Sequence, residues 1–180
     1  MTGIQGKDSR KRDRLTLLIR RYEKDLLRIC YVYLHDADLA RDAVQDTFLK
    51  AWTHLDSLRE EEKEKSWLAR IAVNVCRDYL RSSWTRHINR YVRPEDLQAA
   101  AEQPDGTRAA LTAAVMNLPR KYMEAVTLRY VQGYDIREAA GILGITPSAV
   151  SRRCRKACRP TSAIRRTCSP SRPTSTPSTT

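Results

Sequence analysis

The side chains best suited to chemistry form a row of hydroxyl and cationic groups between positions 148 and 156. At about 100° per residue these groups share one side of a helix, with a lysine at its edge. The row consists of Ser148, Ser151, Arg152, Arg155 and Lys156. Arginine binds guanine edges and phosphates, and serine binds phosphates or bases, so the row predicts contact with the major groove of DNA. The alternative is an ordinary helical hairpin with a solvated basic face.

The segment around this row carries start and stop signals for two helices joined by a tight turn. Asp135 is placed to cap the first helix, and Glu138 to act as the reciprocal partner of a capping box. Gly144 can take the left-handed conformation that ends a helix, after which Thr146 can cap the second helix and Pro147 can occupy its first position. The inward side of that second helix consists of Val150, Cys154 and Ala157. Together these signals predict a helix-turn-helix.

A second basic stripe lies on the helix expected over residues 66–81, which Ser66 can cap. Opposite its apolar arc, within about 60°, lie Arg70, Asn74, Arg77 and Arg81. Asn74 can hydrogen-bond a base edge while the neighbouring arginines hold phosphates. Every amphipathic helix has a polar face, however. The residues alone therefore leave DNA contact and a plain solvated face as alternatives.

These candidate sites lie on a chain that is expected to be all-α, with two small helical modules. Apolar residues spaced by three and four predict helices over residues 15–34, from Asp36 or Asp38 to residue 55, and over 66–81. The expected parts are a basic N-terminal segment (1–14), a first module (15–86), a flexible linker (87–107), a second module (108–158) and a disordered basic tail (159–180). The linker and tail are rich in polar residues and proline and have little to bury.

The charge of the chain favours a polyanionic partner. The formal net charge is +12 and the sequence pI is about 9.8, which points to nucleic acid. No stretch resembles a signal peptide or a membrane span, so we expect no membrane association and a cytoplasmic protein. Cysteines are then expected to be reduced thiols.

Catalysis, cofactors and metals find no support in the sequence. The histidines His35, His54 and His87 are scattered, and no nucleophile elbow or glycine-rich phosphate loop is present. Cys154 and Cys158 have an i,i+4 spacing but lack further ligands in a zinc pattern. The acidic run 60–64 is typical of a solvated loop rather than a nuclease centre. We therefore expect a non-enzymatic protein without a cofactor or metal. An ordinary helix-turn-helix repressor is a rival, but it leaves the first module without a role.

Three segments resemble a known family. Residues 42–52, DAVQDTFLKAW, resemble the polymerase-docking helix of sigma region 2, and residues 67–81, WLARIAVNVCRDYLR, resemble the promoter-opening helix that follows it. Residues 118–130, LPRKYMEAVTLRY, together with the helix-turn-helix, resemble region 4. Their order and spacing, with the linker between them, are similar to the extracytoplasmic-function (ECF) group of the sigma-70 family of RNA polymerase sigma factors. The likeness covers residues 15–156.

The resemblance implies a factor that binds core RNA polymerase and promoter DNA to start transcription. The residues expected to dock on the clamp helices of the largest polymerase subunit are Asp42, Gln45 and Asp46. The residues at the family's promoter-opening positions are Asn74, Asp78 and Arg81. The residues expected to read the minus-thirty-five element are Ser148, Ser151, Arg152 and Arg153. An anti-sigma factor is a further partner that the resemblance implies.

Three departures from the family stand out. Val73 occupies a position that is often basic in the family, and the loop 60–65 before the opening helix is acidic. The resemblance does not identify which residue of that loop captures a flipped base. The chain also has no Asp or Glu after Glu138 and turns to Arg, Cys, Ser, Thr and Pro from Cys154 onward. One hypothesis is a shifted reading frame near residues 153–159, and the alternative is a natural disordered basic tail.

Overall fold

The computed structural model describes residues 3–58, 60–82 and 115–158, and side chains from residue 8 onward. The described part is built from helices and contains no strand, which confirms the predicted all-α class. Its first part contains α1 (Gly3–Leu34), α2 (Ala37–His54), the 3₁₀ turns η1 (Leu55–Ser57) and η2 (Glu61–Lys63), and α3 (Glu64–Arg81). Its second part contains α6 (Arg120–Val126), the π-helical turn η4 (Thr127–Val131), α7 (Ile136–Leu143) and α8 (Pro147–Ala157). The predicted linker 87–107 and tail 159–180 lie outside the described residues.

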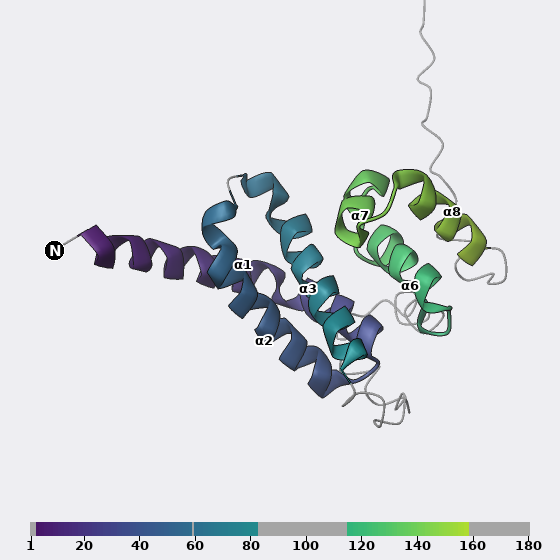
Figure 1. The fold of residues 1–180 in the computed structure, drawn as a ribbon, viewed down its shortest axis with the longest axis horizontal. Helices are drawn as coiled ribbons and strands as arrows, with labels where there is room; N and C mark the ends of the chain where they lie inside the picture. Colours follow the sequence, from purple (N-terminus) through teal and green to yellow (C-terminus); the bar gives the residue numbers. More distant parts are fainter. Residues whose placement is uncertain (1–2, 59, 83–114, 159–180) are drawn as a thin grey trace, which may run out of the picture.

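The first three helices pack on one another as a bundle, because each presents a continuous apolar side (Figure 1). Side chains fully buried between them include Leu26, Ile29, Cys30, Ala43, Ala51, Leu68, Ala72 and Cys76. His35 has a left-handed backbone with a φ of 59°, which ends α1. The Asp36 side chain then accepts a 2.9 Å hydrogen bond from the Leu39 amide and caps α2, as one of the two predicted alternatives.

Two helix starts differ from expectation. α1 begins at Gly3 and not at residue 15. Two basic side chains in the added turns contact the rest of the first module. Lys11 forms a 3.0 Å ion pair with Asp56, and Arg14 donates to the Leu58 carbonyl at 3.1 Å. α3 begins at Glu64, two residues before the predicted cap at Ser66, because the turn η2 leads directly into it.

The second module consists of α6, α7 and α8 around a small apolar core. Buried side chains in this core include Met123, Val126, Leu128, Ala139, Leu143, Val150 and Cys154. The module also contacts the first one, with α7 against α3 and α6 against α1 (Figure 1). The two modules therefore pack together in this structure. No helix among the described residues is long and apolar enough to cross a membrane.

Candidate nucleic-acid interface

The helix-turn-helix forms as its local signals predict. The Asp135 carboxylate accepts from the Glu138 amide at 2.7 Å, and Glu138 accepts in return from the Asp135 amide at 2.8 Å. Gly144 has a φ of 69°, a left-handed conformation that favours glycine and ends α7. Thr146 then caps α8 by accepting from the Ala149 amide, with Pro147 in the first helical turn. These caps fix the angle between α7 and α8.

One side of α8 packs inward and the other faces solvent. Val150, Cys154 and Ala157 are buried, as predicted. Ser148, Arg152, Arg155 and Lys156 are exposed, and Ser151 is half-buried beside them. Burial raises the pKa of the Cys154 thiol to about 11, so this cysteine is protonated at neutral pH. The described residues hold no cluster of three or more metal-ligating side chains.

Arg153 is separated from this exposed row. It is half-buried, and its guanidinium lies 3.9 Å from the Glu124 carboxylate of α6. In this conformation it faces the first helix of the second module rather than the open side of α8. Of the predicted cationic residues on α8, Arg153 is therefore the one that forms an ion pair with another described residue.

The polar stripe of α3 likewise contains exposed residues and one residue, Arg77, that contacts another helix. Arg70, Asn74, Asp78 and Arg81 are exposed. Asp78 forms ion pairs with Lys50 of α2 at 3.3 Å and with Arg81 at 3.8 Å. Arg77 instead points toward the second module, where it lies 3.4 Å from Glu124 and from the Leu143 carbonyl.

The three residues of α2 that are predicted to dock on polymerase, here called the docking ridge, also differ in their exposure. Asp42 and Gln45 are exposed, whereas Asp46 is half-buried and accepts a 2.8 Å hydrogen bond from the Tyr79 hydroxyl of α3. Burial, with the Asp46 carboxylate as the next cause, raises the pKa of Tyr79 to about 12. Asp46 thus links the ridge to the helix that carries Asn74 and Arg77.

Sequence reasoning missed Glu64, which anchors the loop before α3. Its carboxylate is 5% exposed and pairs with Arg14 at 3.4 Å and Arg21 at 3.5 Å, both from α1. The run 60–64 was expected to be a solvated loop, but a buried carboxylate with two cationic partners is a fixed support. The seven-residue spacing of Arg14 and Arg21 was the available signal, since it places both on one side of α1.

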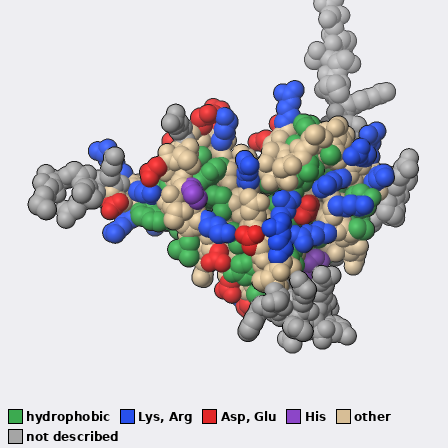
Figure 2. Space-filling model, in the orientation of Figure 1, with side chains coloured by type: hydrophobic (Ala, Val, Ile, Leu, Met, Phe, Trp, Pro, Cys, Tyr) green, Lys and Arg blue, Asp and Glu red, His purple; other side chains and the backbone are tan. Residues whose placement is uncertain are grey.

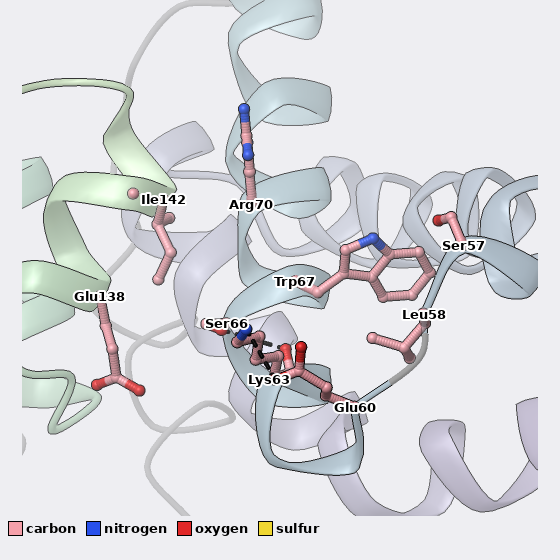
Figure 3. A pocket seen from close by; sticks show the side chains of 10 residues that line it. Ser57, Leu58, Glu60, Lys63, Ser66, Trp67, Arg70, Glu138 and Ile142 are labelled. Carbon is pink, nitrogen blue, oxygen red and sulfur yellow. Dashed lines mark hydrogen bonds and ion pairs between the residues drawn. The ribbon is translucent and has the colours of Figure 1, made fainter.

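A pocket of about 380 Å³ lies beside this loop, where α3 faces α7 (Figure 3). The first module lines it with Ser57, Leu58, Glu60, Lys63, Ser66, Trp67 and Arg70, and the second with Glu138, Gly141 and Ile142. The half-buried Trp67 ring forms part of one wall, next to Leu58. Glu60 and Lys63 form a 2.7 Å ion pair at its edge. The pocket thus combines an aromatic face with polar groups.

Positive charge gathers over this part of the molecule. Figure 2 shows Lys and Arg side chains concentrated where α3 meets α6 and along α6 and α8. The exposed cationic residues that are predicted to contact DNA are Arg70 and Arg81 on α3 and Arg152, Arg155 and Lys156 on α8. A basic face of this kind attracts polyanions.

Comparison with known proteins agrees with this geometry. Residues 18–86 match the family Sigma-70 region 2, and residues 108–159 match Sigma-70, region 4. The chain is 32% identical over 142 residues to the ECF RNA polymerase sigma factor SigM of Mycobacterium tuberculosis, covering 78% of this chain and 71% of that protein. It is also 32% identical over 133 residues to the ECF RNA polymerase sigma factor SigM of Bacillus subtilis, covering 69% and 78%.

Solved structures share the fold. CnrH, in complex with the cytosolic domain of CnrY, aligns with a TM-score of 0.58 at 26% identity, covering 79% of this chain and 81% of that one. The sigma factor RpoE from Bartonella quintana, in complex with the anti-sigma factor NepR, aligns with a TM-score of 0.61 at 22% identity, covering 86% and 94%. The resemblance seen in the sequence is confirmed. The chain belongs to the sigma-70 family and is an ECF RNA polymerase sigma factor, a non-enzymatic, DNA-binding initiator of transcription.

Proposed function

We propose that this sigma factor divides transcription initiation among three surfaces on α2, α3 and α8. The exposed row of α8, held by two helix caps, is the observation that carries this proposal. A capped helix with short hydroxyls and arginines on its free side suits a major groove. The other two surfaces lie on neighbouring helices of the first module.

On α2, Asp42 and Gln45 are the groups that meet core polymerase. Both side chains are exposed on the helix surface, and an exposed carboxylate next to an amide can accept and donate hydrogen bonds to a charged partner. Asp46 supports the same ridge through its bond to Tyr79. The clamp helices of the largest polymerase subunit are the partner that the family resemblance implies.

On α3, Asn74, Asp78 and Arg81 stand at the promoter-opening positions. Opening without nucleotide hydrolysis requires that unstacked bases be captured, because stacking and pairing are lost. We propose that the pocket beside Trp67 receives such a base. An aromatic ring next to polar groups is suited to a nucleobase, and Glu64 anchors the loop beside it through its ion pairs with Arg14 and Arg21. Arg70 lines the same pocket and can hold a phosphate.

On α8, Ser148, Ser151, Arg152, Arg155 and Lys156 form the proposed reading surface for the minus-thirty-five element. Arg153 joins them once it is released from Glu124. Cytoplasmic location follows from this role, since core polymerase and promoter DNA are there. An anti-sigma partner is also proposed, because related sigma factors such as RpoE of Bartonella quintana are seen bound to one.

Run-off transcription with purified core polymerase tests the function directly. The full chain should bind core polymerase and direct it to defined start sites on genomic fragments. A helix-turn-helix repressor would instead bind a DNA site without polymerase and give no start sites. If the folded chain supports no polymerase-dependent initiation, the proposal fails.

A further inference from the structure

The first turns of α1 extend past the other helices of the first module (Figure 1). One side of this part of the helix is packed against the module. Lys11 pairs with Asp56, and its ammonium lies 5.0 Å from the centre of the Trp52 ring. Leu18, two turns further on, is buried. These contacts fix the rotation of α1 about its axis, so the side chains on its other sides have defined directions.

Three arginines and a leucine form a stripe between positions 10 and 21 of this helix, here called the α1 stripe. At about 100° per residue, its members fall within about 60° of one another. They are Arg10, Arg14, Leu17 and Arg21. Arg10 is exposed, Leu17 is 60% exposed, and the Arg21 side chain is 63% exposed. Asp13 is the only acidic residue between these positions, and it lies outside the stripe.

The α1 stripe borders the loop between α2 and α3. The Arg14 guanidinium donates to the Leu58 carbonyl at 3.1 Å and pairs with Glu64 at 3.4 Å. Arg21 pairs with the same carboxylate at 3.5 Å. Leu58 is also part of the pocket beside Trp67 (Figure 3). The stripe therefore lies against the loop that forms one wall of the pocket proposed for an unstacked base.

The stripe has more positive charge than its partners neutralise. One carboxylate, Glu64, faces two of its arginines, and Arg10 forms no ion pair with another described residue. Like charges one turn apart on a helix repel each other, so the charges of Arg10 and Arg14 do not stabilise α1. A solvated helix face typically alternates in sign, whereas cations in a row are suited to a polyanion.

The position of the stripe favours a DNA strand as that polyanion. A base that leaves its stack brings the phosphates of its own strand to the rim of the pocket. Glu61 and Glu62 of the loop are exposed and repel phosphates, so the cationic side of α1 is the favoured path past the loop. From Arg10 to Arg21 the helix rises about 16 Å, which matches roughly five nucleotides of one strand at B-form spacing.

We propose that the α1 stripe binds the phosphate backbone of the promoter strand next to the captured base. The proposal rests on the function proposed above and adds a surface to those on α2, α3 and α8. Arg10 and Arg21 hold phosphates, whereas Arg14 positions the loop through Leu58 and Glu64. Because phosphates are the same in every sequence, the stripe adds affinity for opened DNA and no sequence preference.

Arg10→Gln tests the stripe in the full-length chain, and Arg12→Gln is the matched control. Both arginines are exposed and neither forms an ion pair with another described residue, but Arg12 lies on the opposite side of α1. The probe is a fluorescent oligo(dT) strand, titrated without polymerase. At about 0.1 M salt, Arg10→Gln should bind it about fivefold more weakly, and the slope of log affinity against log salt should fall by about 0.7. Circular dichroism should show equal helix content in the two variants.

Crosslinking identifies the partner of the stripe in the polymerase complex on a mapped promoter. A benzophenone amino acid replaces Leu17, inside the stripe, or Glu23, which is exposed on the opposite side of α1. Promoter DNA should be labelled from position 17 and not from position 23.

The proposal is overturned if Arg10→Gln and Arg12→Gln weaken oligo(dT) binding equally, because the effect would then be one of general charge. It is also overturned if position 17 labels no DNA. Labelling of polymerase alone would make this side of α1 a protein-docking surface. The oligo(dT) titration uses neither polymerase nor a promoter, so its outcome is separate from that of run-off transcription, which tests the sigma function itself.

Discussion

The two helices proposed to touch DNA, α3 and α8, differ in how far their polar side chains are exposed to solvent. On α8, Ser148, Arg152, Arg155 and Lys156 face solvent. On α3, Arg77 is held by Glu124, and the pocket beside Trp67 is bounded by α7. The rest of the chain thus covers more of the polar side of α3 than of α8. In this structure the exposed row of α8 is open to duplex DNA, whereas residues of α7 bound the pocket proposed for an extruded base.

The helices also differ in how they are fixed. α8 is set by caps within a few residues of its start, at Thr146 and Gly144. α3 has no side-chain cap, and its start depends on Glu64 pairing with Arg14 and Arg21 of α1. A locally capped helix is positioned by its own sequence. A helix held by distant partners is positioned by the whole module, so changes on α1 reach the opening surface.

The largest effect is expected on α8. Arg152→Ala should cost about 1–3 kcal/mol of binding to a mapped promoter if Arg152 reads a base edge. Affinities of the polymerase complex for the promoter and for base-substituted promoters measure this. The loss should be greatest on the matched sequence, and the preference at one position should relax. Lys24→Ala, at an exposed site on α1, is the control for the lost charge.

An equal loss on every sequence would make Arg152 a phosphate contact. In that case the salt dependence should also change, by a slope of about 0.9 per lost contact. α8 would then position the chain on DNA, and sequence specificity would depend on other residues.

The next effect concerns the docking ridge. Asp42→Ala should lower affinity for core polymerase roughly tenfold, because a hydrogen bond to a charged group is lost. Binding of labelled factor to core polymerase measures it. Asp46→Ala is expected to act in the same direction, but it also removes the acceptor of the Tyr79 hydroxyl.

Tyr79→Phe separates the two roles of Asp46. It keeps the ring and removes the hydroxyl, so it breaks the link between α2 and α3 without touching the ridge carboxylate. If Tyr79→Phe weakens docking as much as Asp46→Ala, then Asp46 acts by positioning α3. If Asp46→Ala leaves docking intact, its assignment to the polymerase surface is wrong.

A smaller effect is expected on α3. Asn74→Ala should reduce promoter opening by the polymerase complex by about fivefold, which corresponds to one lost hydrogen bond of about 1 kcal/mol. Permanganate reactivity of unpaired thymines measures opening. Duplex binding by the free factor should be unchanged, since α8 is the helix proposed to carry it. A loss of duplex binding in Asn74→Ala would remove the proposed difference between the helices.

Local signals predicted the parts of the fold that depend on neighbours in sequence. The capping box at Asp135 and Glu138, the left-handed Gly144 and the buried side of α8 all follow from residues within one or two helical turns. The family resemblance was readable for a similar reason, because each motif is a continuous segment. The predicted site residues remain predictions that the experiments above test.

Long-range partners were not predictable in the same way. Nothing near Glu124 in sequence indicates that Arg77, 47 residues away, will lie against it. Glu64 looked like one of several solvated glutamates, since its partners lie on α1 about 50 residues earlier. Burial of a charge depends on which surfaces meet in three dimensions. A single sequence shows the surfaces but not their pairing.

The smallest effect is a pH dependence at Tyr79, which joins α2 to α3. Its pKa is raised to about 12, first by burial and then by the Asp46 carboxylate, above an ordinary value of 10.0. The folded state therefore favours the neutral phenol, and this stabilisation is complete below pH 10 and lost as pH rises through 12. The melting temperature of the wild type should fall more steeply between these pH values than that of Tyr79→Phe. Parallel curves would show that the bond to Asp46 contributes nothing measurable, and the two helices would then be coupled by apolar packing alone.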